Sequence, residues 1–356
     1  DDATQGVLLY YKYVTLSENE REAVASWLET LCKDLALVGR VRVALDGINV
    51  TLGGNTAQLQ EHIAAVQAHP LVGGPDIDFK LAISSGAINE QASHETGFKD
   101  LRVLTRAELV TLGPLAAGIR AEQGGTHYSP YDFQDTLLER QSTGAAANTV
   151  LIDTRNCYES RIGRFDVEGI AVEVPQIRQF SDFPAWVDDN VERLRGKTVM
   201  MYCTGGVRCE RASAYLIKKG AEFENVIQLE GGIQRYLEAF PDGGFFKGKN
   251  FVFDDRLAIA GAEDVGSGVV GACMSCGRGT DDYGPRLRCP KCRLLLLVCE
   301  RCAKRGEKLP LCEICAPIKA DAVSILREPT RKLKVLCLHG FRQTGNQFKG
   351  RTAALR

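Results

Sequence analysis

The sequence has 356 residues, of which 44% are hydrophobic and 25% are charged, and its formal net charge is −1. This composition excludes a mostly disordered chain, and the length favours two or three domains over a single core. The apolar run from Leu294 to Val298 is too short to cross a membrane. The net charge near zero does not indicate nucleic-acid binding, whereas 13 cysteines are many for a reducing compartment and need an explanation from their positions.

The first 88 residues alternate between strand-like and helix-like patterns. The expected elements are a strand at 7–14, a helix from a Ser17–Glu20 capping box to Leu37, strands at 40–45 and 48–52, a helix at 56–68 and a strand at 77–83. Asp46-Gly47 supplies the turn between the paired strands, and Gly39 is expected to end the first helix. The order β-α-β-β-α-β predicts a ferredoxin-like (acylphosphatase-like) α+β domain over residues 1–88.

Residues 89–125 show a weaker pattern and are interpreted as a linker, with a helix near Arg106 to Leu112 and with Phe98 and Leu101 packed against a neighbour. A second α/β pattern runs over residues 126–243. Its expected strands lie at 149–153, 198–203 and 226–229, and the helical segments between them indicate a parallel sheet. Beyond residue 243 the hydrophobic periodicity fails, and Gly, Arg, Lys and Cys dominate.

A glycine-rich loop follows the strand that ends at Cys203, and a helix is expected near Glu210 to Lys218. Such a loop directs backbone N–H groups into one concavity, and the helix N-terminus adds positive potential, so Cys203 is expected to have a lowered pKa and to act as a nucleophile. The remaining residues of the expected anion cradle are Thr204, Gly205, Gly206, Val207 and Cys209. Arg208 and Arg211 add charge that would stabilise a thiolate or a persulfide. The alternative, a small core cysteine, is disfavoured by the glycines, the arginine and the helix start.

Together these motifs resemble a rhodanese domain. The resemblance rests on Asp153-Thr154-Arg155 after a strand, on Glu159, on the six-residue loop from Cys203 to Arg208, and on Glu230-Gly231-Gly232. It implies that Cys203 carries a persulfide, that the loop amides and Arg208 hold its sulfur, and that Asp153 and Arg155 brace the site from the first strand. The segment Gly163 to Gly169 departs from the family's usual Gly-His-Ile-Pro-Gly-Ala, which indicates a divergent branch.

Three runs resemble the bacterial tRNA wobble-uridine 5-hydroxylase family, a divergent rhodanese branch. They are Gly39-Arg40 with Asp46-Gly47-Ile48-Asn49, the run from Cys203 to Glu210, and the run from Phe246 to Arg256. The resemblance extends over roughly residues 7–315. It implies oxygen-dependent formation of 5-hydroxyuridine at the wobble position of tRNA, with Cys203 as the essential residue. Cys209 is interpreted as a packing residue, with a resolving thiol as the less favoured alternative.

Four C-x-x-C pairs lie within 43 residues near the C-terminus. They are Cys273 with Cys276, Cys289 with Cys292, Cys299 with Cys302, and Cys312 with Cys315. Two such pairs complete a closed tetrahedral S₄ site, so the eight thiolates predict two structural zinc ions; an iron–sulfur cluster or a disulfide framework is the alternative. The spacers allow sequential or interleaved pairing, and a strand at Leu294 to Val298 between the sites favours an interleaved cross-brace. No organic cofactor is evident.

Basic residues concentrate at the C-terminal end of the sequence. Residues 286–356 contain 17 Lys or Arg and 5 Asp or Glu, a net of +12, which leaves −13 for the preceding residues. This excess favours phosphate binding over an ordinary solvated face, and tRNA, through its anticodon region, is the expected partner. Arg40, Arg42, Lys247 and Lys249 lie in the family-like motifs and are candidate RNA contacts.

The segment from Lys332 to Gln343 resembles the opening of an α/β serine hydrolase, whose nucleophile would lie on a later Gly-x-Ser-x-Gly elbow. No such elbow follows before Arg356, so residues 321–356 are interpreted as the start of a truncated hydrolase domain, behind a cysteine-rich two-zinc module at 244–320. Some plant and algal proteins fuse a rhodanese-type region to such a hydrolase, and the chain is similar to that arrangement. A chance likeness is the alternative.

Two functions from different classes follow. The first is a rhodanese-type cysteine enzyme that modifies tRNA, and the alternative is a sulfurtransferase that moves sulfane sulfur from thiosulfate or a persulfide carrier to a thiol acceptor. A non-catalytic scaffold is the weakest hypothesis, because Cys203 is intact. The chain begins at Asp1 and lacks the basic flank of a signal peptide, so a cytoplasmic location is expected, with an organellar one if the N-terminus is trimmed. Neither the sulfur or oxygen donor nor the oligomeric state follows from the sequence.

Overall fold

The computed structural model describes residues 4–83, 100–251, 258–259, 268–284, 286–306 and 308–316. The chain divides into two compact units, residues 1–314 and 315–356. Apart from Cys315 and Ala316, the described residues all belong to the first unit.

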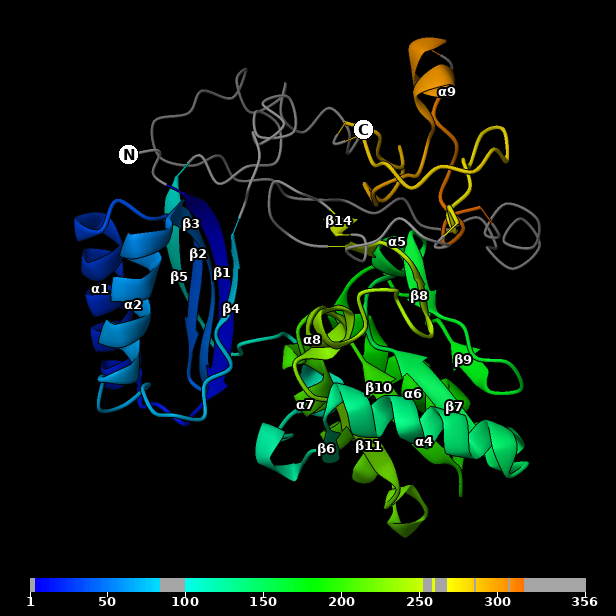
Figure 1. Cartoon of the computed structure of the whole chain (residues 1–356), viewed down its shortest axis with the longest axis horizontal. Helices are drawn as coiled ribbons and strands as arrows, with labels where there is room; N and C mark the ends of the chain where they lie inside the picture. Colours follow the sequence, from blue (N-terminus) through cyan, green and yellow to red (C-terminus); the bar gives the residue numbers. More distant parts are fainter. Residues whose placement is uncertain are drawn as a thin grey trace, which may run out of the picture. The chain divides into compact units, whose positions relative to one another are not determined.

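The N-terminal domain is a five-stranded sheet with two helices on one face (Figure 1). Its elements are β1 (Gln5–Tyr13), α1 (Glu18–Asp34), β2 (Val38–Ala44), β3 (Gly47–Asn55), α2 (Thr56–Gln67), β4 (Lys80–Ile83) and β5 (Leu101–Arg106). The strand order is β4-β1-β3-β2-β5, and β1 pairs antiparallel with both β3 and β4. The first four strands and two helices confirm the expected ferredoxin-like order.

The end of α1 differs from the expectation. The Ser17–Glu20 capping box is present, but the helix ends at Asp34 instead of continuing to Leu37. Ala36 adopts a positive φ of 51°, and the Leu37 N–H donates to the Cys32 carbonyl (2.8 Å), which closes the helix with a left-handed turn at an alanine in place of the usual glycine. Gly39, the expected stop, instead lies inside β2.

Residues 100–125, the described part of the segment interpreted as a linker, contain regular structure. Residues 101–106 form β5, which pairs in parallel with β2 at the edge of the N-terminal sheet, so the helix expected near Arg106 to Leu112 is wrong. Alternating apolar residues explain the strand, because Leu101 and Val103 pack against the N-terminal core. Further along, Leu112 and Ile119 are buried in the core of the following domain. Phe98 lies outside the described residues.

The second domain is a parallel sheet between two layers of helices (Figure 1). Its elements are β6 (Thr126–Tyr128), α4 (Pro130–Ser142), β7 (Thr149–Asp153), α5 (Cys157–Ser160), β8 (Gly163–Phe165), β9 (Ala171–Glu173), α6 (Phe183–Leu194), β10 (Thr198–Tyr202), α7 (Val207–Ile217), β11 (Val226–Leu229) and α8 (Gly232–Ala239). The order is β6-β11-β10-β7-β9, and all neighbouring strands are parallel, as expected.

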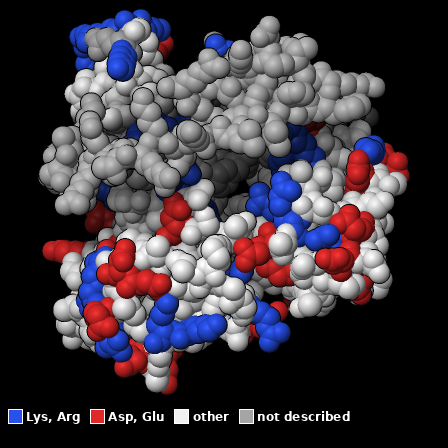
Figure 2. Space-filling model, turned by 180° about the vertical axis from the view of Figure 1, so that it is seen from behind, with Lys and Arg blue, Asp and Glu red and all other residues white. Residues whose placement is uncertain are grey.

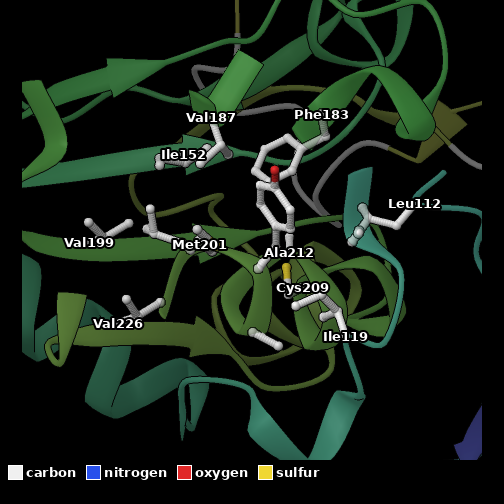
Figure 3. Packing of buried hydrophobic residues seen from close by; sticks show 14 of the residues in the cluster. Leu112, Ile119, Ile152, Phe183, Val187, Val199, Met201, Cys209, Ala212 and Val226 are labelled. Carbon is white, nitrogen blue, oxygen red and sulfur yellow. The ribbon is translucent and has the colours of Figure 1, made fainter. Parts of the chain in front are cut away.

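Central strand β10 has a core on each face. Val199 and Met201 contribute to one core, and Met200 and Tyr202 contribute to the other. This two-sided burial explains the continuous apolar run in the sequence, since a strand covered on both faces has no polar side. Cys203 continues the alternation and belongs to the same core as Val199 and Met201, where the side chains interlock (Figure 3).

The remaining described residues contain little regular structure. They include β12 (Phe246–Gly248), which pairs with β8, and β13 (Asn250–Phe251), β14 (Ala258–Ile259) and α9 (Glu300–Lys304). Leu294 to Val298 is buried, but the expected strand is reduced to one bridge between Leu295 and Arg288. Its side chains Leu295 and Leu297 form a small core with Ile162, Phe251 and Tyr283. None of the described helices is long and apolar enough to cross a membrane.

Candidate active site

Cys203 lies between the end of β10 and the start of α7, fully buried. The helix begins at Val207, three residues earlier than expected, so the loop is short and tightly wound. The Gly206 N–H donates to the Cys203 Sγ (3.1 Å). Gly206 has a φ of 99°, and a Cβ there would lie 2.8 Å from the Tyr11 hydroxyl, so both its backbone and its surroundings require glycine. The Gly206 N–H is therefore directed at the Cys203 sulfur, as an amide cradle requires.

The surroundings of Cys203 favour its thiolate. Burial acts to raise the pKa of Cys203, but a hydrogen bond from the Cys209 thiol, the charge of Arg208 and the backbone N–H groups of residues 208 and 209 outweigh it and lower the pKa well below the usual value. The first turn of α7 thus supplies three of these effects. The lowered pKa of Cys203 agrees with the expectation, and the thiolate is the reactive form of a cysteine.

Arg208 is held in place by Glu159. Its Nη1 and Nη2 donate to the two carboxylate oxygens of Glu159, both at 2.7 Å, and Nη2 also donates to the Thr204 Oγ1 at 3.1 Å. The Glu159 side chain is fully buried, and that of Arg208 is 9% exposed. Thr204 in turn donates to Glu159 (3.3 Å). This network fixes the guanidinium beside the loop, because a bidentate pair with a carboxylate restricts the arginine side chain to one geometry.

Asp153 and Arg155 form a second buried pair at the end of β7. Arg155 Nε and Nη2 donate to the Asp153 carboxylate (2.9 and 2.7 Å), and Nη2 also donates to the Gly163 carbonyl (2.7 Å). Both side chains are fully buried. The pair ties β7 to the strand β8 and holds α5, which carries Glu159, between them. Its position agrees with the expected bracing role.

Gly231 and Gly232 allow the start of α8 to pack closely against the loop. The Ile233 and Gln234 N–H groups donate to the carbonyls of Cys203 and Thr204 (3.0 and 3.1 Å). A Cβ at Gly232 would lie 2.7 Å from the Gly206 nitrogen and 2.6 Å from the Cys203 oxygen. The two glycines also have positive φ values of 68° and 66°. This motif therefore permits a close backbone approach that any side chain would prevent.

Cys209 is a core residue. Its side chain lies among apolar neighbours that include Leu112, Ile119 and Ala212 (Figure 3), and its Sγ is 3.6 Å from the Thr154 hydroxyl. Burial, followed by the neighbouring Cys203, raises the pKa of Cys209 well above its usual value. It is therefore a protonated donor to Cys203, and this position supports the packing interpretation more than that of a resolving thiol.

The N-terminal sheet supplies residues that sequence reasoning missed. The Tyr13 hydroxyl donates to the Val207 carbonyl (2.9 Å), and the Tyr11 hydroxyl donates to Glu210 (3.0 Å). A Cβ at Gly205 would lie 3.2 Å from the Leu9 Cδ2. The signal was present in β1, where aromatic or apolar residues occupy both alternating faces, which indicates that both faces of the strand are covered.

Arg211 does not serve the cysteine. Its guanidinium is buried and donates to the carbonyls of Val110 (2.9 Å) and Ile119 (3.3 Å) and to the Glu108 carboxylate (2.8 Å). These contacts support a structural role for Arg211 in place of the expected stabilisation of the Cys203 thiolate. Arg211 fastens residues 108–119 to α7.

The four candidate RNA contacts lie in two places. Arg40 and Arg42 lie within β2, where they donate to Asp100 and to the Leu109 carbonyl, respectively. Lys247 donates to the Gly244 carbonyl, and Lys249 forms ion pairs with Asp281 and Asp282. Figure 2 shows basic and acidic side chains interspersed over the described surface in that view. The strongly basic residues beyond 316 and the hydrolase-like segment lie outside the described residues.

The eight cysteines near the C-terminus gather in two groups of four. Cys273, Cys276, Cys299 and Cys302 form one group, and Cys289, Cys292, Cys312 and Cys315 form the other, with all sulfur atoms of a group within 4.8 Å of one another. The first pair therefore joins the third, and the second joins the fourth, which is the interleaved cross-brace favoured above. Each group can hold a metal ion.

The sequence matches three family models in succession. The UPF0176 acylphosphatase-like domain matches residues 5–109, the rhodanese-like domain matches residues 134–239, and the rhodanase C-terminal region matches residues 247–316. These ranges follow the N-terminal sheet, the parallel sheet with Cys203, and the segment with the cysteine groups.

Relatives extend over the same domains. Rhodanese-like domain-containing protein 6 of Arabidopsis thaliana is 44% identical over 369 residues, and the chain spans 62% of its length. A tRNA uridine(34) hydroxylase of Staphylococcus epidermidis is 37% identical over 297 residues, which make up 83% of each protein. One of Enterococcus faecalis is 37% identical over 255 residues, 71% of this chain and 72% of that protein. With the cysteine cradle, the domain order and this shared length taken together, the chain belongs to the tRNA uridine(34) hydroxylase family of rhodanese-domain proteins.

Proposed function

We propose that the chain is a rhodanese-type cysteine enzyme that hydroxylates uridine 34 of tRNA, with Cys203 as the essential residue. One observation carries this proposal: a buried cysteine with a lowered pKa lies in an amide cradle and is flanked by a fixed arginine. The bacterial relatives whose names state this activity match the chain over the same domains. The rhodanese model alone would not give a tRNA substrate, since a fold does not determine a function.

The residues of the cradle have distinct parts in this proposal. The Gly206 amide and the first turn of α7 stabilise negative charge on the Cys203 sulfur, as a thiolate or as the terminal atom of a persulfide. Arg208 adds positive charge beside the sulfur, and its bidentate pair with Glu159 keeps that charge in one position. Cys209 donates a hydrogen bond and stays protonated.

The test is the wobble nucleoside itself. Mass spectrometry of tRNA nucleosides is carried out on cells that lack the gene and are complemented with the wild-type chain, Cys203→Ser or Cys157→Ser. Cys157 is a matched control, because it is a buried cysteine of the same domain whose pKa burial raises to about 11. The wild type and Cys157→Ser are expected to restore 5-hydroxyuridine and Cys203→Ser to fail. Equal levels in all strains would overturn the proposal.

The same cradle supports a second candidate function, sulfur transfer. A Cys203 thiolate can attack the sulfane sulfur of thiosulfate, the S–S bond of the donor breaks, sulfite leaves, and Cys203 retains the sulfur as a persulfide that a thiol acceptor removes. The buried thiolate beside Arg208 favours this step as well. A thiosulfate:cyanide activity that Cys203→Ser abolishes, with no effect on wobble nucleosides, would establish this function in place of the first.

We further infer that both cysteine groups hold structural zinc. The donors are thiols alone, and a tetrahedron with Zn–S bonds of about 2.3 Å has sulfur atoms about 3.8 Å apart. The Cys276 and Cys299 sulfur atoms are 3.8 Å apart, and those of Cys292 and Cys312 are 3.5 Å apart. Four thiolates leave zinc no open position, so its role would be to fold the segment. Elemental analysis is expected to give about two zinc ions per chain, and a value near zero would overturn this inference.

The RNA surface and the location of the protein complete the proposal. The anticodon arm of tRNA is the proposed partner. Arg40 and Arg42 in β2, Lys247 in β12 and Lys249 directly after it are the candidate phosphate contacts. The compartment would be the cytoplasm, with an organelle as the alternative. Filter binding of tRNA by the wild type and by single variants of these four residues, each at two salt concentrations, would show whether each residue contributes to the salt dependence of binding.

A further inference from the structure

Lys80 is a buried lysine on the face of the N-terminal sheet that meets the cysteine loop. It opens β4 and lies directly opposite Leu9 in the antiparallel register with β1. Directly opposed residues share one face of a sheet, and so do residues two apart on a strand, so Lys80, Leu9 and Tyr11 share a face. Leu9 and Tyr11 are the side chains nearest to a Cβ built at Gly205 and Gly206, respectively. The lysine therefore stands beside the loop that holds Cys203.

The charge of Lys80 is incompletely paired. Its side chain is fully buried, and its Nζ forms an ion pair with Asp78 (2.5 Å) and lies 5.7 Å from the centre of the Tyr11 ring. Among the described residues, no acceptor satisfies hydrogen-bond geometry at Nζ. An ammonium group has three N–H donors, and burying them without acceptors is costly unless a ligand or a reacting group fills the space. A buried ammonium group with unused N–H donors therefore points to a binding or reactive site beside it.

Asp78 is shared with the second domain. Its carboxylate also accepts from Arg235 Nε (2.9 Å) on α8, and Arg235 donates to the Phe79 carbonyl (2.9 Å). Arg235 also pairs with Glu238, so Lys80 shares the Asp78 carboxylate within a cluster of two cations and two carboxylates. Burial lowers the pKa of Lys80, the ion pair with Asp78 acts to raise it, Arg235 acts to lower it, and the charge of Cys203 has the smallest of these effects and acts to raise it.

We propose that Lys80 is an active-site residue whose ammonium, supplied by the N-terminal domain, stabilises negative charge on the Cys203 side chain, as a thiolate or as a persulfide. The inference rests on the proposed role of Cys203 as the reacting cysteine. It gives the N-terminal domain a part in the chemistry: the rhodanese domain holds the sulfur from the loop side with amides and Arg208, and β4 supplies a second cation from the opposite side.

Other groups that face Cys203 limit the size of the effect. Arg208 and Cys209 approach from α7, and Tyr11 and Tyr13 approach from β1. Burial raises the pKa of both tyrosines, followed by a carboxylate (Glu210 for Tyr11 and Asp46 for Tyr13), and the charge of Cys203 adds a smaller increase. The two tyrosines remain neutral, so Lys80 and Arg208 are the cations of this set. Loss of Lys80 is expected to matter less than loss of Arg208, because Arg208 has the larger influence on Cys203.

The experiment measures the pH dependence of Cys203 alkylation in the full chain, followed by mass spectrometry of the Cys203 peptide. Variants are Lys80→Met, which keeps the volume, Lys80→Gln as a second neutral form, and Lys80→Arg, which keeps the charge. Lys12→Met is the matched control, since Lys12 also lies on this sheet and pairs with a carboxylate, Asp76, at 2.9 Å. Thermal unfolding confirms that each variant is folded.

The neutral variants are expected to move the midpoint of the alkylation profile upward by about half a pH unit or more, because a nearby opposite charge is lost. Lys80→Arg and Lys12→Met are expected to keep the wild-type midpoint. A purely structural lysine would change the limiting rate or the thermal midpoint but not the pH midpoint, and an unchanged pH midpoint in folded Lys80→Met or Lys80→Gln overturns the inference. If the midpoint moves but Cys203→Ser leaves the wobble nucleosides unaltered, the proposed hydroxylase function fails while Lys80 remains part of the cysteine site.

Discussion

At the scale of single residues, the site depends on the pairing of Glu159 with Arg208. Because both side chains are buried, removing the carboxylate would leave a guanidinium without its partner in a low-dielectric environment. Glu159→Ala is expected to lower the apparent free energy of unfolding by about 3–5 kcal/mol, measured by urea denaturation. Glu173→Ala, which breaks a more exposed pair with Arg193, is expected to cost less than about 1 kcal/mol. Equal losses in the two variants would contradict this account of the pair.

The pH response of Cys203 is also a residue-scale property. Its pKa is lowered in the folded protein, so the thiolate is expected to react at a constant rate from pH 8 to 7 and to lose reactivity below its folded pKa. The same sign holds for stability: the contribution is complete above the unfolded pKa and is lost as the pH falls through the folded one. Cys157, with a pKa raised to about 11, is the internal control and should stay unlabelled at neutral pH. A Cys203 midpoint above pH 8 would contradict the prediction.

At the scale of elements, residues 108–119 are held by a side chain instead of by helical hydrogen bonds. Arg211 joins two carbonyls and the Glu108 carboxylate from within α7, so Arg211→Ala would leave these acceptors unsatisfied. The variant is expected to lose about 3 kcal/mol of stability and to be cleaved faster within this segment in limited proteolysis. Arg120→Ala, an exposed arginine in the same region, should behave like the wild type. Unchanged cleavage in Arg211→Ala would show that other contacts hold the segment.

Elements with strong local patterns could be predicted from the sequence, and elements held by distant side chains could not. The strands at 149–153 and 226–229 have the expected bounds, because each is an apolar run flanked by turns. The cysteine pairs also followed from spacing, which left sequential and interleaved grouping open; the interleaved grouping was favoured by a strand that the structure reduces to one bridge. In contrast, the partner of Arg211 lies about a hundred residues away, and Lys80 meets the loop only through the register of β4 with β1. Periodicity reveals that a face is covered but does not reveal what covers it.

At the scale of the whole molecule, the cysteine-rich segment is attached to the helix that carries Glu159. Arg161, directly after α5, donates through Nε to Glu313 (2.7 Å) and through Nη1 to the Leu295 carbonyl (3.1 Å). The Tyr283 hydroxyl donates to the Tyr158 carbonyl (2.7 Å) within α5 itself. Glu313 directly follows Cys312, a member of the second cysteine group. A change in the structure of that group is therefore expected to be transmitted to α5 through the contact between Glu313 and Arg161.

This connection predicts that the metal groups support the cysteine site from a distance. Glu313→Gln weakens the tie to Arg161, and, on the proposal that the cysteine groups hold zinc, a chelator would release the whole segment. Both are expected to increase hydrogen exchange in α5 and to slow Cys203 alkylation, with the chelator having the larger effect. Glu300→Gln is the matched control, because Glu300 lies in the same segment but pairs only with the exposed Lys304 among the described ion pairs. The effect is expected to reach Cys203 because α5 positions Glu159 and Glu159 positions Arg208. Unchanged hydrogen exchange in α5 after chelation would show that the rhodanese domain maintains its site without the cysteine-rich segment.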